Sequence, residues 1–211
     1  LAQSDPDFEC LVVDDGSTDQ TWQQLLKLPE LHPRENIILI RRSKNSGKGA
    51  ALKAGFLQST GDIVLVQDAD LEYHPDDYPQ LLEPFIKYQA DVVYGSRFIT
   101  HLPHRVLYFW HYQANLLLTQ FSNLLTNLNL SDMETGYKLF NGSLLRKIAP
   151  GLTSPRFGFE PEITARISKI PNLKLYEVGI SYAGRTYLEG KKINWRDGLW
   201  ALWCVIKYNL L

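Results

Sequence analysis

The sequence predicts an α/β fold built on a mainly parallel sheet with helices on both faces. Two observations predict it. Short apolar runs alternate with helical segments between residues 8 and 98, and the apolar runs at 8–15 and 62–68 end in acidic residues. Strands that are buried on both faces are near-continuous apolar runs, because helices cover each side of such a sheet. In this architecture the ligand site lies at the carboxyl ends of the strands.

The expected elements follow in chain order. We expect strands at 8–15, 36–42, 62–68 and 90–98, and helices at 18–28, 47–60 and 74–89. The second half begins with a long apolar, aromatic-rich helical stretch at 105–130, with a break expected near its middle. Polar loops are expected at 131–140 and 154–162, a basic loop at 183–198, and an apolar C-terminal helix at 195–211. No repeat or linker divides the chain, so residues 1–211 are expected to form one domain.

Composition bounds the function. The chain has 211 residues, of which 45% are hydrophobic, enough for one globular core. The net charge of −1 argues against nucleic acid as the main partner. Cys10 and Cys204 lie near opposite ends and make no disulfide framework, which favours a reducing compartment. The only methionine is Met133, so we expect a fragment or a processed product.

Three carboxylates, Asp68, Asp70 and Glu72, follow the apolar run 63–66. Residues i and i+2 of a strand point the same way, so the three face one point if the extended conformation continues. Hard oxygen ligands suit Mg²⁺ or Mn²⁺, which bind one or two carboxylates together with substrate phosphates. The alternative is an acidic turn that caps the next helix, and the triplet alone does not decide between the two. Its position after a buried strand favours the metal site.

Two other segments have the residue types of a ligand site. In "VVDDGSTD" (12–19), Asp14 and Asp15 end a strand, where a carboxylate can accept hydrogen bonds from a base or a ribose hydroxyl. The same segment is a strand-to-helix turn in which Ser17 or Thr18 caps the helix. In "KNSGKGAALKAG" (44–55), glycines and Lys48 at a helix start indicate an anion site, although the P-loop pattern is absent. The alternative there is a tight turn with helix packing.

An ordered series of segments runs through essentially the whole chain: "VVDDGSTDQT", "NSGKGAA", "QDADLEYHP", "VVYGSRF", "SDMETGYKLF", "FGFEPEI" and "VGISYAGRTYLEGKKINWRDG". It resembles the family 2 glycosyltransferases of GT-A fold, in the branch that includes dolichyl- and polyprenyl-phosphate hexose synthases. The resemblance implies a Rossmann-like mixed sheet and transfer of a hexose, with inversion, from a GDP- or UDP-linked donor with a divalent metal. Relatives have a first strand before the point where this chain begins, so we expect that strand to be missing.

The resemblance also implies a role for each matching residue on the donor side. Asp68-Ala69-Asp70 matches the DxD motif that holds the metal and the donor pyrophosphate. Glu72 stands where dolichyl-phosphate mannose synthases often have Gln as a further metal ligand. Val13 and Asp15 match contacts to the donor nucleoside.

The basic residues and one acid complete the implied site. Arg97 matches an arginine that reaches the phosphates or the acceptor. Arg185 and Lys191 match the basic pair of a loop that closes over the donor phosphates. Asp132 stands at the family's acidic position before the Thr-Gly. With a phosphate acceptor, we expect Asp132 to orient the acceptor or a basic side chain such as Lys138.

Three functional hypotheses remain open. The first is hexosyl transfer to a polyprenyl phosphate by a cytoplasmic enzyme, peripheral at the inner face of the membrane. The aromatic and basic side chains expected at that bilayer interface are Trp195, Trp200, Trp203, Lys191, Lys192, Arg196 and Lys207. The second is transfer to a saccharide or glycolipid hydroxyl, which needs a general base, Asp132 or Glu134. The third is a nucleotide-sugar-binding module without turnover.

Overall fold

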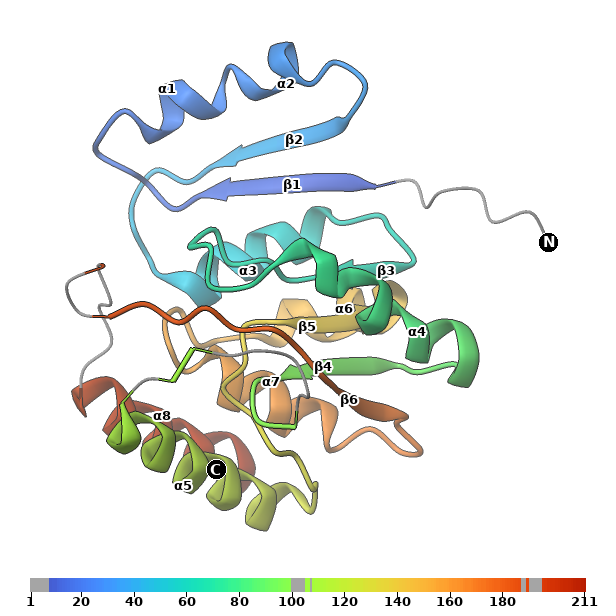
Figure 1. Ribbon diagram of the computed structural model, residues 1–211, viewed down its shortest axis with the longest axis vertical. Coiled ribbons are helices and arrows are strands. Elements are labelled where there is room, and N and C mark those ends of the chain that lie inside the picture. The colour runs from blue at the N-terminus through green and yellow to red at the C-terminus, as the bar shows by residue number, and fades with distance from the viewer. Residues whose placement is uncertain (1–7, 100–104, 107, 187–188, 190–194) are drawn as a thin grey trace.

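The computed structural model describes residues 8–99, 105–106, 108–186, 189 and 195–211. Figure 1 shows the order of the elements along the chain. The strands are β1 (Glu9–Asp14), β2 (Asn36–Arg41), β3 (Ile63–Leu65), β4 (Val92–Ser96), β5 (Lys138–Asn141) and β6 (Leu175–Gly179). The helices are α1 (Thr21–Leu25), α2 (Leu28–Leu31), α3 (Lys48–Gln58), α4 (Tyr78–Tyr88), α5 (Phe109–Thr126), α6 (Gly142–Ile148), α7 (Phe159–Ile167) and α8 (Trp195–Leu210), with 3₁₀ turns η1 (Pro75–Asp77) and η2 (Ala149–Gly151).

The strands form two open groups, one parallel and one mixed, with helices packed around them, which confirms the predicted α/β class. β1 pairs with β2 in parallel, and β3, β5, β4 and β6 lie in that order in a second group. Within this group β4 and β6 are parallel, whereas β5 is antiparallel to both of its neighbours. Among the described residues no ladder joins the two groups of strands. A first strand preceding this chain stays a prediction.

The central strand β4 explains why helices cover both faces. Successive strand residues point to opposite sides. Val92 and Tyr94 accordingly belong to one apolar cluster, and Val93 belongs to another. The first cluster packs the sheet against α3, α5, α6, α7 and α8. The second cluster packs it against α4, whose Leu81 is fully buried.

Three helical segments differ from expectation. The stretch at 105–130 contains α5 as one unbroken helix, because residues 109–126 hold neither glycine nor proline. The helix expected at 18–28 is limited to α1 at 21–25, and a second short helix, α2, begins at residue 28. Half of the expected polar loop at 154–162 is the start of α7, where Pro161 lies in the first turn and removes no helical hydrogen bond. Among the described helices, none has the length and apolarity needed to cross a bilayer.

Candidate functional site

The glycine-rich turn before α3 is tied to the end of β1 by Asp15. Its carboxylate accepts hydrogen bonds from the backbone N–H of Ser46 (2.9 Å) and of Gly47 (2.5 Å). Gly47 has φ +99, and a Cβ there would lie 2.5 Å from the Arg156 side chain, so only glycine suits this position. The turn that begins α3 is therefore positioned by contacts from two distant parts of the chain.

Lys48, the first residue of α3, lies between two carboxylates. Its Nζ is 2.9 Å from Asp68 Oδ2 and 2.8 Å from Glu160 Oε1. Burial opposes the charge of Lys48, but the two carboxylates outweigh it and raise the pKa of the ammonium above its usual value. Lys48 thus joins the start of α3 to the acidic segment after β3 and to buried helix α7.

The acidic segment does not continue the strand. β3 ends at Leu65, and residues 69–73 form a turn in which Leu71 has φ +62. A bulky residue with this conformation is strained, and Leu71 is also 90% exposed. The extended arrangement that would direct Asp68, Asp70 and Glu72 to one point is therefore absent.

Arg185 connects the other two carboxylates of this segment. Its Nη2 is 2.8 Å from Asp70 Oδ2, and its Nε is 3.2 Å from Glu72 Oε1. The backbone N–H of Arg185 also donates to Glu72 Oε1 (2.8 Å), and the Tyr182 hydroxyl donates to Glu72 Oε2 (3.2 Å). Burial, together with the nearby Glu72 and Asp68 carboxylates, raises the pKa of Asp70. Negative charge is therefore concentrated at this turn and offset by one arginine.

The carboxylate oxygens of these residues are suitable ligands for a divalent cation, although they are not preorganised around one point. Among the described residues, no group of three or more His, Cys, Asp or Glu side chains is placed to hold a metal ion. Asp68 turns to Lys48, whereas Asp70 and Glu72 turn to Arg185. Mg²⁺ and Mn²⁺ need only one or two carboxylates when substrate phosphates supply the other ligands. The donor set therefore fits a metal that arrives together with a diphosphate.

Gly136 allows the segment before β5 to approach the acidic turn closely. A Cβ at Gly136 would lie 2.6 Å from Asp68 Oδ2 and 2.8 Å from the Tyr73 ring. The backbone N–H of Gly136 donates to the Tyr73 hydroxyl at 2.8 Å. The Thr-Gly pair therefore belongs to the wall of the site.

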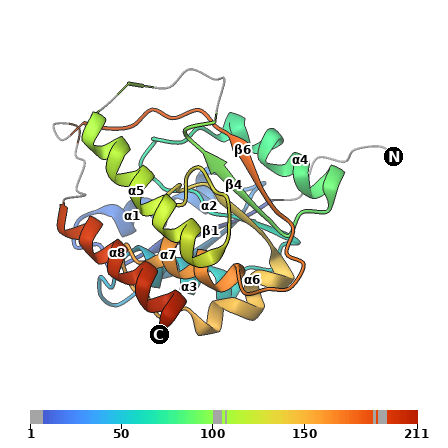
Figure 2. The same cartoon turned by 90° about the horizontal axis from the view of Figure 1, so that it is seen from below.

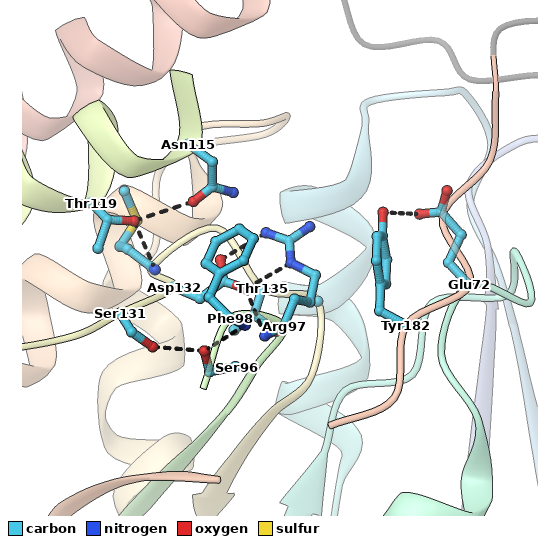
Figure 3. A network of polar contacts seen from close by, with 12 residues as sticks. Glu72, Ser96, Arg97, Phe98, Asn115, Thr119, Ser131, Asp132, Thr135 and Tyr182 are labelled. Atoms are coloured by element: carbon cyan, nitrogen blue, oxygen red, sulfur yellow. Dashed lines mark hydrogen bonds and ion pairs between the residues drawn. The ribbon is translucent and has the colours of Figure 1, made fainter. Parts of the chain in front are cut away.

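Arg97 and Asp132 form a buried bidentate ion pair beside this turn (Figure 3). Arg97 Nε donates to Asp132 Oδ2 at 2.6 Å, and Nη2 donates to Oδ1 at 2.7 Å. The Arg97 guanidinium also lies over the Tyr182 ring, 5.2 Å from its centroid. Burial opposes its charge, but Asp132 outweighs burial and raises the pKa of Arg97. The basic partner of Asp132 is therefore Arg97 and not Lys138.

Lys138 and Glu134, both named from the sequence, belong to a second buried polar group. Lys138 Nζ donates to the carbonyls of Met133 (2.9 Å) and Thr135 (2.5 Å) and lies 4.4 Å from the centroid of the Tyr94 ring. Burial, followed by the nearby Glu160 carboxylate, raises the pKa of Glu134 to about 8. Burial lowers the pKa of Lys138 to about 8.

The remaining predicted residues are placed as follows. Asp14 is buried, its Oδ1 accepts from the Ser17 N–H at 3.1 Å, and its Oδ2 lies 3.7 Å from Arg41 Nε. Val13 is half-buried in β1 and faces Gly55 of α3. Ala69 is exposed in the acidic turn. Lys191 and Lys192 lie outside the described residues.

The predicted site residues other than Val13, Asp14, Ala69 and Lys191 thus lie along one series of contacts. One half runs from Asp15 through the glycine turn and Lys48 to Asp68. The other half runs from Asp70 and Glu72 through Arg185 and Tyr182 to Arg97 and Asp132. Asp68 directly precedes the turn that holds Asp70, so the two residues join the two halves. All of these residues follow the carboxyl ends of strands or lie on loops that pack there, as expected for an α/β site.

Comparisons with known proteins identify the family. Residues 1–149 match the family described as Glycosyl transferase family 2. The chain is 30% identical over 194 residues to a Dictyostelium discoideum protein named dolichyl-phosphate beta-glucosyltransferase, covering 89% of this chain and 58% of the relative. It is 29% identical over 202 residues to the undecaprenyl-phosphate mannosyltransferase of Micrococcus luteus, covering 90% of this chain and 78% of the relative.

A solved structure supports the fold. Glucosyl-3-phosphoglycerate synthase from Mycobacterium tuberculosis, in complex with Mn²⁺, UDP and phosphoglyceric acid, superimposes with a TM-score of 0.69. The sequences are 18% identical, and the match covers 96% of this chain and 68% of that chain. At this identity the likeness shows the fold alone, and it confirms the predicted GT-A architecture.

Proposed function

Because this chain belongs to glycosyl transferase family 2, we propose that it transfers a hexose from a nucleoside diphosphate sugar to a polyprenyl phosphate. The observation that carries the proposal is the acidic turn at Asp70 and Glu72, which is offset by Arg185 and lies in contact with Arg97 through Tyr182. Relatives with chain-wide similarity are named for transfer to dolichyl and undecaprenyl phosphates. The chain spans only 58% of the first of them.

The proposed cofactor is Mg²⁺ or Mn²⁺, held by Asp70 with Asp68 and Glu72 close by. When bound, the metal supplies positive charge that stabilises the departing nucleoside diphosphate. This chain's own cations, Arg97 and Arg185, orient the phosphates and offset their remaining charge. The Mn²⁺ of the structurally similar synthase supports the choice of a divalent ion.

The donor is a GDP- or UDP-hexose in this proposal. Val13, Asp14 and Asp15 at the end of β1 contact the nucleoside, and Lys48 contributes positive charge near the phosphates. Asp15 already accepts two backbone N–H bonds from the glycine turn. Its contribution is therefore to keep that turn in place as well as to contact the nucleoside. Lys191, the other basic residue of the motif, is assigned to the donor phosphates by the resemblance alone.

A phosphate acceptor removes the need for a strong base. Its second pKa is about 6, so the attacking oxygen is already largely ionised at neutral pH. Asp132 accepts two guanidinium hydrogen bonds and has no exposed side-chain surface, so it is poorly placed to take a proton. Its role is to position Arg97. The alternative with a hydroxyl acceptor consequently loses one of its two candidate bases.

We further propose that the protein binds the cytoplasmic face of a membrane through α5 and α8, which lie side by side (Figure 2). Trp110, Leu117 and Leu124, seven residues apart on α5, are 77%, 63% and 76% exposed. On α8, Trp200 and Trp203 are 47% and 45% exposed. The exposed Lys207 adds positive charge, and an apolar face with aromatic and basic residues suits a bilayer interface. The side chains of Trp195 and Arg196 lie outside the described residues.

A transfer assay tests the proposed reaction. Full-length protein is incubated with radiolabelled GDP- or UDP-hexoses, a polyprenyl phosphate and Mg²⁺ or Mn²⁺, and label is counted in the organic phase. We expect label in the lipid with one donor, loss of transfer in EDTA, and no transfer by Asp70→Ala. Arg34→Gln is the matched surface control, because Arg34 is exposed before β2, at the end of the strand away from the site. Transfer to a sugar hydroxyl but not to lipid phosphate would contradict the proposal.

A further inference from the structure

Arg185 contacts both carboxylates that the proposed function assigns to the metal. One guanidinium reaches Asp70 Oδ2 at 2.8 Å and Glu72 Oε1 at 3.2 Å. Two backbone contacts hold the segments together: Arg185 N–H donates to Glu72 Oε1 at 2.8 Å, and Ala183 N–H donates to the Glu72 carbonyl at 3.0 Å. A cation bound by Asp70 and Glu72 would therefore meet the guanidinium within a few ångströms.

We propose that Arg185 is the counter-ion of Asp70 and Glu72 in the nucleotide-free protein, and that it moves from these carboxylates to the donor diphosphate when the metal binds. This inference rests on the proposed function for the ligands involved. It concerns the free protein, however, and its test requires no transfer reaction.

Electrostatics supports an exchange over simultaneous binding. A divalent cation and a guanidinium repel each other. The two carboxylates of Asp70 and Glu72 cannot neutralise the positive charge of both at once. A diphosphate supplies the missing negative charge, and a planar guanidinium binds phosphate oxygens in bidentate fashion as well as it binds carboxylates. Arg185 therefore loses little when a metal-bound diphosphate replaces its carboxylate partners.

The segment that carries Arg185 is held by contacts that permit such a movement. Arg105 donates to the Gly184 carbonyl at 3.1 Å and pairs with Glu189 at 2.8 Å. Arg105 and Glu189 both have exposed side chains, and exposed ion pairs contribute little free energy. The side chain of Arg185 is itself 35% exposed to solvent. Reorienting the guanidinium requires no change in the buried core.

The exchange has a thermodynamic consequence. If Arg185 competes with the metal for the carboxylates but binds the diphosphate, then metal alone binds weakly and metal with nucleotide binds strongly. Each ligand then increases the affinity for the other by the same factor, because coupling between binding sites is reciprocal. Removal of the guanidinium should therefore change the two affinities in opposite directions.

The test is a titration of the full-length protein with Mn²⁺ in the absence of nucleotide, followed by the EPR signal of free Mn²⁺. For Arg185→Gln we expect Mn²⁺ affinity to rise roughly tenfold, from the lost repulsion of a monovalent cation a few ångströms away. With Mn²⁺ saturating, the affinity of the same variant for GDP or UDP should fall. Arg34→Gln removes a distant charge and should leave Mn²⁺ affinity within about twofold of wild type.

The outcomes separate this inference from the proposed function. Unchanged, weaker or unmeasurable Mn²⁺ binding by Arg185→Gln overturns the exchange, even if the wild type transfers sugar to polyprenyl phosphate. A fall in both affinities shows that Arg185 only holds its segment in place, and also overturns it. Tighter Mn²⁺ binding with weaker nucleotide binding supports the exchange, whichever acceptor the transfer assay identifies.

Discussion

The buried pair of Arg97 and Asp132 leads to a quantitative prediction about stability. Asp132→Asn removes the negative charge and leaves the guanidinium, which is 14% exposed, beside a neutral amide. Leaving one member of a buried pair uncompensated costs about 3–5 kcal/mol. Because Arg97 keeps some contact with solvent, we expect about 3 kcal/mol, the lower end of that range. At about 2–4 °C per kcal/mol for a chain of this size, Tm should fall by about 6–12 °C.

Thermal unfolding followed by circular dichroism measures this change. The double variant Arg97→Met with Asp132→Leu buries no lone charge, so most of the lost stability should return. The control is Glu83→Gln, which removes an exposed i,i+4 pair with Lys87 and should lower Tm by less than about 2 °C. A similar small fall for Asp132→Asn would refute the reasoning. So would a double variant that is as unstable as the single one.

The same variant tests the role of Asp132 in the reaction. At a temperature below its lowered Tm, Asp132→Asn should keep the pH profile of the wild-type rate, because the proposed function assigns Asp132 the positioning of Arg97 and no proton transfer. Its loss of rate should be smaller than that of Arg185→Ala, for which we expect about 10²-fold or more, comparable to losing one preorganised donor. Abolished activity in Asp132→Asn, together with a wild-type rate that follows one deprotonation near neutral pH, would identify Asp132 as the base. A hydroxyl acceptor would then replace the lipid phosphate.

Three further predictions concern the walls and surface of the site. Gly136→Ala places a Cβ 2.6 Å from Asp68 Oδ2, so the free energy of unfolding measured by chemical denaturation should fall by about 1–3 kcal/mol. Unchanged stability would show that the neighbouring side chains move aside without cost. Glu134 has its pKa raised to about 8, so the native protein retains a proton that the unfolded chain releases above pH 4.5. Its contribution to stability is therefore lost as pH rises towards 8. The free energy of unfolding is measured for both proteins at pH 5 and at pH 8. Between these two pH values it should fall by at least about 1 kcal/mol less in Glu134→Gln than in the wild type. Equal falls in the two proteins would contradict the raised pKa of Glu134. Trp110→Glu with Leu117→Glu should abolish flotation of the full-length protein with anionic liposomes, and flotation equal to that of Arg34→Gln would exclude α5 as the membrane-binding surface.

The strands could be predicted from sequence because their signal is local. The apolar runs at 8–15, 36–42 and 90–98 become β1, β2 and β4 with ends shifted by one or two residues. Burial on both faces requires apolar residues at every position, and this requirement is visible without any tertiary contact. The sequence predicts a loop at the start of α7, because its proline and acidic residues suit both a loop and a first helical turn.

The acidic turn was predicted in position but not in conformation. Extended backbone through residue 72 would keep the three carboxylates on one side, but the strand ends at Leu65, before the first of them. The turn with Leu71 at φ +62 then separates Asp68 from its neighbours. Such a conformation is uncommon for leucine and is maintained by surrounding contacts, so no local rule predicts it.

By itself the sequence determined the class of fold, the strand ends that carry the acids, and the family motifs in their order. Only the tertiary structure decided which charges meet. Lys48 pairs with Glu160 across more than a hundred residues, Arg185 pairs with Asp70 across a similar separation, and Asp132 faces Arg97 instead of Lys138. Periodicity along the chain reports which side of an element a residue occupies. The choice of partner depends on distance and burial in three dimensions, which sequence spacing does not encode.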